Sequence, residues 1–276
     1  MLEALNTLLW GPGTLALILG TGAWLTLRTG GFPQRNLGRA LTLSLGREAR
    51  RKGRGGVSPF GSLMTALAST VGTGNIVGVA AALVSGGPGA LVWMELAAFL
   101  GLAAKFAECM LAVKYRHVRR DGTRWGGPMA VMETRLGSAG AVLGRFYALF
   151  ALLMAFAMGA MAQSGALADT FFAAFTLPRW RVGLVTAVLA LAILLGGIRR
   201  IAEISTVLVP VMALLYLGGG LAVILGNLRR LPEALILMLR CAVAPEAALG
   251  GALGIVTRRE ALRWGVARSV FSNEAG

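Results

Sequence analysis

The chain has 276 residues, of which 56% are hydrophobic and only 14% are charged; its mean hydropathy is +0.71. Soluble domains carry about 25% charged residues, so this composition excludes an ordinary water-soluble domain. The net charge of +15 would suit a nucleic-acid partner, but the basic residues lie in short links between apolar runs, as in the cytoplasmic loops of membrane proteins. We expect a protein embedded in the lipid bilayer, with no nucleic-acid partner.

Several apolar runs approach the length that a helix needs to cross a bilayer core of roughly 30 Å. Backbone groups in lipid must be satisfied internally, and the runs do not alternate as barrel strands do, so we expect an all-α membrane protein. The mixed stretch 229–259 is expected to be interfacial or re-entrant. We predict one transmembrane domain, 1–276, with a seventh helix that begins near 261 and is cut at 276. Its six full spans are expected near 8–27, 59–84, 90–113, 146–177, 182–198 and 204–228.

The loop charges orient these spans. Eight basic residues lie between Arg28 and Arg54, opposed only by Glu48, and six more lie between Lys114 and Arg135. Under the positive-inside rule these links are cytoplasmic, which places the N-terminus outside. The expected location is the cell membrane, as a multi-pass protein of a bacterial inner membrane. The basic stretch 229–259 falls outside in this scheme, against the rule.

A few polar side chains lie within the apolar runs. Lys105 and Glu108 are three residues apart, so they share a helix face and can pair. Gln163 could contact a substrate or bond a neighbouring helix, since polar groups at membrane depth face the protein interior. Asp169 lies nearer the end of its run, which favours structural pairing.

The sequence predicts no enzyme and no cofactor. A membrane-embedded enzyme needs clustered His, Asp or Cys residues, and the single His117 lies in a basic loop. Cys109 and Cys241 have no CxxC spacing and are interpreted as buried free thiols.

The second apolar run is interrupted by Val71–Asn75, with the sequence VGTGN. Glycine costs about 1 kcal/mol against alanine inside a helix, so this stretch favours unwinding. An unwound break exposes carbonyls for a cation and amides for a carboxylate. Two alternatives remain: Gly74–Gly78 forms a GxxxG that could serve helix packing alone, and Gly72–Gly74 is similar to a dinucleotide-binding loop, although no strand precedes it.

The run Thr65–Ala80, TALASTVGTGNIVGVA, resembles the signature of the alanine or glycine:cation symporter family, the sodium:alanine symporters. Two departures stand out: Ser269 replaces a usual glycine, and Ala130–Met132 lacks the aromatic pair that often follows the family's GGPM. Further motifs continue the resemblance in order: Gly86–Ala90, Lys105–Cys109, Leu111–Arg116, Gly126–Met129 and Phe271–Gly276.

The resemblance implies a LeuT-type inverted-repeat transporter fold, in which two five-helix repeats enclose a midplane site. This chain would hold an extra N-terminal helix and the first repeat, with the second repeat mostly missing. The first helix of each repeat is broken in that fold, so the broken helices here would be the second and the seventh.

The resemblance also implies the site residues. The carbonyls of Ala68 and Val71 and the hydroxyl of Thr70 would face a sodium ion. The substrate-binding residues would be Thr73, Gly74, Asn75, Gln163, Phe271, Ser272, Asn273 and Gly276.

The implied function is sodium-coupled symport of a small neutral amino acid, alanine or glycine, by alternating access. Sodium is the coupling ion, and the sequence leaves the oligomeric state undetermined. Because the second repeat would supply half of the moving bundle, the 276-residue chain alone is expected not to accumulate alanine. The alternative is a non-transporting structural subunit or fragment of a membrane complex.

Overall fold

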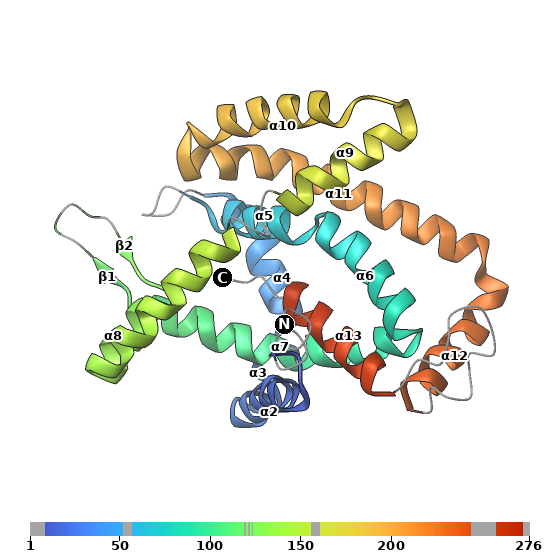
Figure 1. Ribbon diagram of the computed structural model, residues 1–276. Helices are drawn as coiled ribbons and strands as arrows, with labels where there is room; N and C mark the ends of the chain where they lie inside the picture. The colour runs from blue at the N-terminus through green and yellow to red at the C-terminus, as the bar shows by residue number, and fades with distance from the viewer. Residues whose placement is uncertain are drawn as a thin grey trace. The chain divides into compact units, whose positions relative to one another are not determined.

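The computed structural model describes residues 9–51, 57–118, 120, 122, 124–155, 161–243 and 258–272, and at 73, 74, 162, 258–260, 271 and 272 it describes the backbone alone. The described residues are mostly helical, and their one sheet pairs β1 (His117–Val118) with β2 (Arg124–Trp125) in antiparallel fashion (Figure 1). The chain divides into two compact units. The first joins Met1–Ala104 to Ile198–Glu274, and the second is built from Lys105–Gly197.

Long apolar helices dominate the described residues. By length and composition, α7 (Gly89–Lys114), α8 (Pro128–Met154) and α11 (Gly197–Gly226) could cross a membrane, with mean hydropathies of 1.8, 1.6 and 2.3. A fourth candidate is the pair α5 (Pro59–Thr70) and α6 (Thr73–Gly86), which is bent by 42° at a short break. These helices fit the multi-pass membrane class that the composition predicts.

The first unit contains a small core where three helices meet. Leu15 on α2 (Pro12–Arg28), Ala97 on α7 and Val266 on α13 (Arg258–Ser272) are buried against one another. Their small and branched side chains let the helices approach closely. The basic link after α2 forms three short helices: α3 (Phe32–Arg35), α4 (Leu37–Leu45) and η1 (Arg47–Arg50).

The start of α7 packs against α12 (Leu231–Val243), which follows η3 (Leu228–Arg230). The Trp93 indole N–H donates to the Ala242 carbonyl at 3.2 Å. Cys241 is buried as expected, and burial raises the pKa of its thiol. The expectation of burial was wrong for the other cysteine, since Cys109 is exposed on α7.

Within the second unit, α8 is folded back on itself. Gly137 has φ 59° and ψ −133°, a conformation that essentially only glycine adopts. In a straight helix Met129 and Gly144 would be about 22 Å apart, but a Cβ on Gly144 would lie 3.7 Å from the Met129 Cα. A Cβ on Gly140 would overlap the Met132 carbonyl. The two limbs on either side of Gly137 therefore pack against each other, and the apolar length of α8 is not one straight crossing.

Helix bounds differ from the expected spans in several places, and α8 begins at Pro128, well before the span that was expected to begin near 146. The range 146–177, expected as one span, includes the end of α8 and the helix α9 (Met161–Phe175), and residues 156–160 between them lie outside the described residues. The next helix, α10 (Arg179–Leu194), ends early because Gly197, at φ 67°, turns the chain there. Arg199 and Arg200, which fall between the expected spans 182–198 and 204–228, therefore lie at the start of α11.

The predicted Lys105–Glu108 pair is confirmed, and Asp169, for which structural pairing was predicted, has Arg179 as its partner. The Lys105 ammonium lies 3.0 Å from the Glu108 carboxylate on α7. Asp169 accepts a hydrogen bond from the Arg179 guanidinium at 2.6 Å, which joins α9 to α10, and that guanidinium lies 4.6 Å from the Phe172 ring centre. Figure 1 shows α9 and α10 side by side, so this pair closes a helical hairpin.

The loop between α7 and α8 is anchored to the first limb of α8. The His117 ring stacks on Trp125, with 5.7 Å between ring centres, and its Nε2 lies 3.1 Å from the Thr134 hydroxyl. The Arg135 guanidinium lies 5.5 Å from the Tyr115 ring centre. These contacts hold the basic loop in place, and His117 has a structural partner there.

The folded-back α8 predicts an asymmetry between two glycines. Gly140→Ala should lower the free energy of unfolding by about 1–3 kcal/mol, because its methyl group would overlap the Met132 carbonyl. Gly165→Ala on α9 is the matched control: a Cβ there meets nothing within 4 Å, so the higher helix propensity of alanine should leave stability unchanged or raise it. Thermal unfolding in detergent measures both, and equal effects would contradict the fold-back.

The loop charges also predict sidedness. In intact cells, with Cys109 and Cys241 replaced by serine, Arg50→Cys should resist an impermeant thiol reagent, because its basic link is expected in the cytoplasm. Thr176→Cys, in the link between α9 and α10, should react from outside. Ready labelling at position 50 in sealed cells would reverse the proposed orientation.

Candidate functional site

The predicted interruption of the second apolar run is confirmed. Helix α5 ends at Thr70, and α6 begins at Thr73. Between them, Val71 has φ −81° and ψ 73°, and Gly72 is extended with φ −133° and ψ −178°. The two residues therefore leave the helical conformation and place a helix C-terminus opposite a helix N-terminus.

The break redirects the hydrogen bonds at the end of α5. The Gly72 amide donates to the Thr70 carbonyl at 2.9 Å, whereas in a continuous helix it would donate to the Ala68 carbonyl. The Asn75 side-chain amide also donates to the Thr70 carbonyl and so bridges the break. The Thr70 hydroxyl donates to the Ala66 carbonyl at 2.7 Å, which leaves its oxygen lone pairs as acceptors. The break thus removes the helical donors of at least two carbonyls, those of Ala68 and Val71, because the Asn75 amide donates to the Gly72 carbonyl.

The start of α6 presents backbone amides toward the same break. The Gly72 carbonyl accepts from the amides of Asn75 and Ile76, both at 3.1 Å. Thr73 and Gly74 are the first two residues of α6, and the first amides of a helix have no partner within it. These amides and the helix dipole together favour an anionic group such as a carboxylate.

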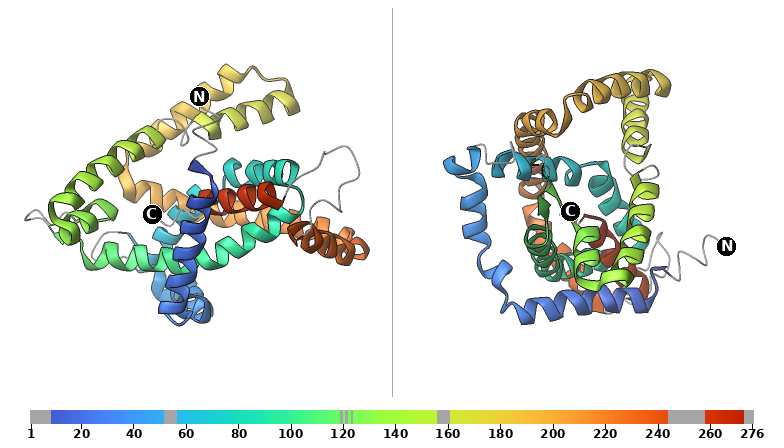
Figure 2. Two further views of the ribbon diagram at one scale, coloured as in Figure 1. Left: turned by 60° about the horizontal axis from the view of Figure 1, so that its bottom comes forward. Right: turned by 90° about the vertical axis from the view of Figure 1, so that its left-hand side faces the viewer.

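Helix α13 runs antiparallel along α6, with glycines at the points of contact (Figures 1 and 2). A Cβ on Gly78 would lie 3.0 Å from the Arg268 guanidinium, and a Cβ on Gly86 would lie 2.9 Å from the Trp264 Cβ. The end of α6 that is next to the break therefore lies beside the C-terminal end of α13. In this register Ser272, the last residue of α13, is level with the start of α6.

The structure brings some of the predicted site residues together. Ala68, Thr70 and Val71 lie at the end of α5, Thr73, Gly74 and Asn75 open α6, and Phe271 and Ser272 end α13. Asn273 and Gly276 lie outside the described residues. Gln163 is exposed on α9, in the second unit, so its approach to the break stays a prediction.

The two alternative interpretations of the glycines have different outcomes. The GxxxG interpretation holds for Gly78, which is buried where α13 packs on α6, but Gly74 opens a helix instead of packing in the middle of one. The dinucleotide interpretation is wrong, because that loop follows a β-strand and Gly72 follows the helix α5. The glycines therefore serve both the break and the packing.

Sequence reasoning missed Arg268. Its guanidinium lies against Gly78 about six residues, or roughly 9 Å along α6, from the break. The available signal was the pairing of a glycine on one helix with a long basic side chain on another. That signal becomes visible only when the register of the two helices is known.

Residues 1–276 match the sequence profile of the sodium:alanine symporter family. The chain belongs to this family. The family consists of transporters, not enzymes, and this membership confirms the resemblance that the sequence motifs indicate. Together with the long apolar helices, it fits a multi-pass membrane protein.

Three relatives are similar over nearly the whole chain. An uncharacterized transporter of Haemophilus influenzae is 45% identical over 277 residues, covering 100% of this chain and 60% of the relative. A sodium/alanine symporter of Methanococcus maripaludis is 41% identical over 278 residues, again covering 100% and 60%. A Bacillus subtilis relative named for sodium/glutamine symport is 37% identical over 274 residues, covering 98% and 55%. The chain thus spans about 60% of the length of the first two relatives.

The bridge across the break yields a stability prediction. Asn75→Ala removes the donor to the Thr70 carbonyl and should lower the free energy of unfolding by about 1 kcal/mol. Asn227→Ala is the matched control, because its side-chain amide donates to the Val223 carbonyl at 2.9 Å at an exposed helix end, where water can replace it. Thermal unfolding should show the larger shift for Asn75→Ala; a shift no larger than that of the control would contradict the bridge.

Proposed function

We propose that the protein performs sodium-coupled symport of a small neutral amino acid across the cell membrane. The observation that supports this proposal is the junction of three helix ends at one break: the carbonyl end of α5, the amide end of α6 and, by register, the C-terminal end of α13. An amino acid and a monovalent cation need these two kinds of backbone group. Family membership supports the choice of solute and ion.

In this proposal the cation binds at the end of α5. The carbonyls of Ala68 and Val71 and the hydroxyl oxygen of Thr70 supply hard oxygen ligands, which suit a sodium ion. The break helps because the Gly72 amide donates elsewhere and leaves the Ala68 carbonyl without its helical donor. A carbonyl at membrane depth without a donor is costly, so a cation there stabilises the interruption.

The substrate carboxylate is proposed to bind the amides of Thr73 and Gly74. The bound sodium would lie close by and attract the same carboxylate. Asn75 and, from the second unit, Gln163 would support the substrate, with residues 271–273 and Gly276 as the opposite wall. The absence of a side chain at Gly74 leaves room for the substrate backbone.

The proposal also specifies the size of the substrate side chain. Relatives are named for sodium/alanine and for sodium/glutamine symport. We propose alanine or glycine for this chain, because the resemblance of its motifs implies a pocket for a side chain no larger than methyl. Transport would proceed by alternating access, with one group of helices rocking against another.

The chain spans about 60% of the length of its first two relatives. The direct test therefore measures whether this chain binds alanine in a sodium-dependent way. Purified chain should bind labelled alanine saturably in sodium chloride and weakly in potassium chloride of equal ionic strength. An excess of unlabelled glycine should compete, and glutamine should compete less. Binding that ignores sodium, or none at all, would favour the alternative of a non-transporting subunit.

Gln163 provides a separate test of the second unit. Gln163→Ala should weaken alanine binding at least tenfold, about 1.4 kcal/mol, if its amide contacts the substrate. Ser164→Ala is the control, since the Ser164 hydroxyl donates only locally, to the Met161 carbonyl at 3.3 Å. If Gln163→Ala binds alanine with unchanged affinity, Gln163 has only a packing role.

A further inference from the structure

The link between α2 and α5 contains an amphipathic helix, α4, whose apolar side is exposed. Leu37, Leu41 and Leu45 lie on one side of this helix, because residues four apart share a helix face. They are 49%, 50% and 49% exposed. Arg39 and Thr42 lie on the opposite side. An exposed apolar stripe of this kind marks a surface that contacts a membrane or another protein.

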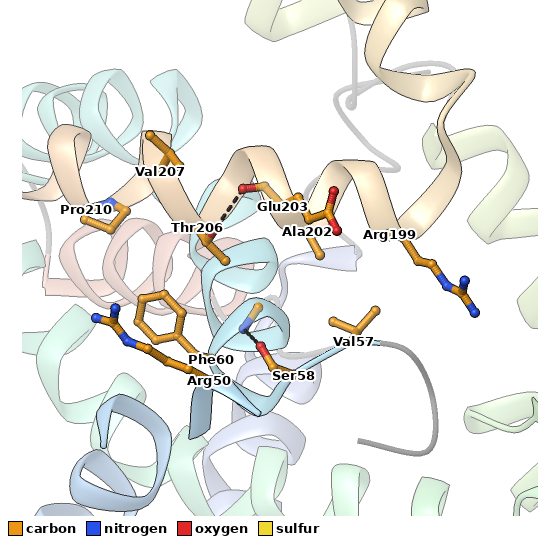
Figure 3. A pocket seen from close by; sticks show the side chains of 11 residues that line it. Arg50, Val57, Ser58, Phe60, Arg199, Ala202, Glu203, Thr206, Val207 and Pro210 are labelled. Carbon is orange, nitrogen blue, oxygen red and sulfur yellow. Dashed lines mark hydrogen bonds between the residues drawn. The ribbon is translucent and has the colours of Figure 1, made fainter. Parts of the chain in front are cut away.

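Helix α4 is held at both ends and runs across the direction of α2 (Figures 1 and 2). Before it, the Gln34 side-chain amide donates to the Phe99 carbonyl on α7 at 3.1 Å. After it, the Arg50 guanidinium lies 4.9 Å from the Phe60 ring centre, and Figure 3 shows both side chains in the lining of a pocket between α5 and α11. Because α2 occupies the first expected span, a helix that runs across it lies along the membrane surface. Nine residues, roughly 14 Å, are also too few to cross a bilayer.

The leucine stripe faces the same side as the body of the first unit. Ser44 lies beside Leu37 on the helix circumference, and it is the one residue of α4 that is partly buried. Leu43, about 200° around the helix from Leu41, is the most exposed of the α4 leucines at 67%. Helix α4 contacts α5, which is expected to enter the membrane from this link. The stripe is therefore on the side where the bilayer is expected.

The charges around α4 complement an anionic surface. Residues 28–51 include six arginines and a single acidic residue, Glu48. The loop charges predict that this link lies in the cytoplasm. Anionic lipids give the cytoplasmic leaflet a negative surface potential, which attracts basic segments next to a span. An amphipathic helix with a basic polar side binds such a leaflet with its apolar side at the boundary between headgroups and acyl chains.

We propose that α4 lies in the headgroup layer of the cytoplasmic leaflet and binds anionic phospholipids there. Its leucine stripe enters the boundary between headgroups and acyl chains. Arg35 and Arg39 contact lipid phosphates, because long arginine side chains reach the charged layer while the helix stays at the boundary. This anchor fixes the depth of the start of α5, the helix that ends at the break. The binding requires neither the amino acid nor sodium.

Nitroxide labels on two matched leucines test the depth of α4 in vesicles. In the full chain, with Cys109 and Cys241 replaced by serine, Leu41→Cys carries a label on the stripe and Leu43→Cys carries one on the opposite side. The vesicles contain phosphatidylcholine and phosphatidylglycerol. The ratio of label collisions with oxygen to collisions with a water-soluble nickel complex should be at least about threefold higher at position 41 than at position 43. Equal ratios would overturn the proposal, as would a label at 41 that meets neither reagent because protein covers it.

Two charge-matched variants of the labelled Leu41→Cys chain test the anionic lipid. Arg35→Gln with Arg39→Gln removes two arginines at α4, and Arg229→Gln with Arg230→Gln removes two from η3 as the control. All four arginines are exposed, so folding should survive, and circular dichroism melting curves check this. Adding phosphatidylglycerol to phosphatidylcholine vesicles should raise the collision ratio in the control, and by at most about half as much in the α4 variant. An equal rise in both variants, or no rise in either, would overturn the binding of anionic lipid by α4.

Discussion

The site depends on one constraint: a backbone group in a bilayer has no water to bond, so each must find its partner in the protein. A helix satisfies this rule automatically, and an interruption violates it. At Val71 and Gly72 the chain meets part of this requirement locally, because the Gly72 amide and the Asn75 side chain both donate to the Thr70 carbonyl. The groups left over are the reason why we propose the break as the binding site, since an ion or a solute can supply the partners that the helix no longer does.

Glycine makes the surroundings of the break compact. On α6 the glycines at 78 and 86 bring α13 close enough that an added Cβ would crowd its side chains. The same residue type folds α8 back at Gly137, where the backbone has a positive φ. Glycine thus has two roles in this chain: it lets helices approach closely, and it adopts a turn conformation that other residues rarely adopt.

The sequence predicted the features that depend on local chemistry. The break follows from the VGTGN stretch, and the Lys105–Glu108 pair follows from a spacing of three residues on a helix. The fold-back of α8 was missed because residues 114–145 were interpreted as a link between two spans, although Gly137 to Gly140 carries the Gly and Ser residues of a turn. Arg268 and the pocket at α11 depend on which helices are neighbours, and periodicity within one helix does not determine that.

The Asn75 side chain joins the two halves of a bent helix, and this has a mechanical consequence. If the angle between α5 and α6, now 42°, widened enough to part Asn75 from Thr70, the Thr70 carbonyl would keep only the Gly72 amide as its donor, and its second lone pair could face a positive charge. The angle of the joint and the occupancy of the break are therefore thermodynamically linked, and each shifts the other by the same free energy. The hydrogen bond of Asn75 thus couples the angle between the two half-helices to whether the space between them is filled.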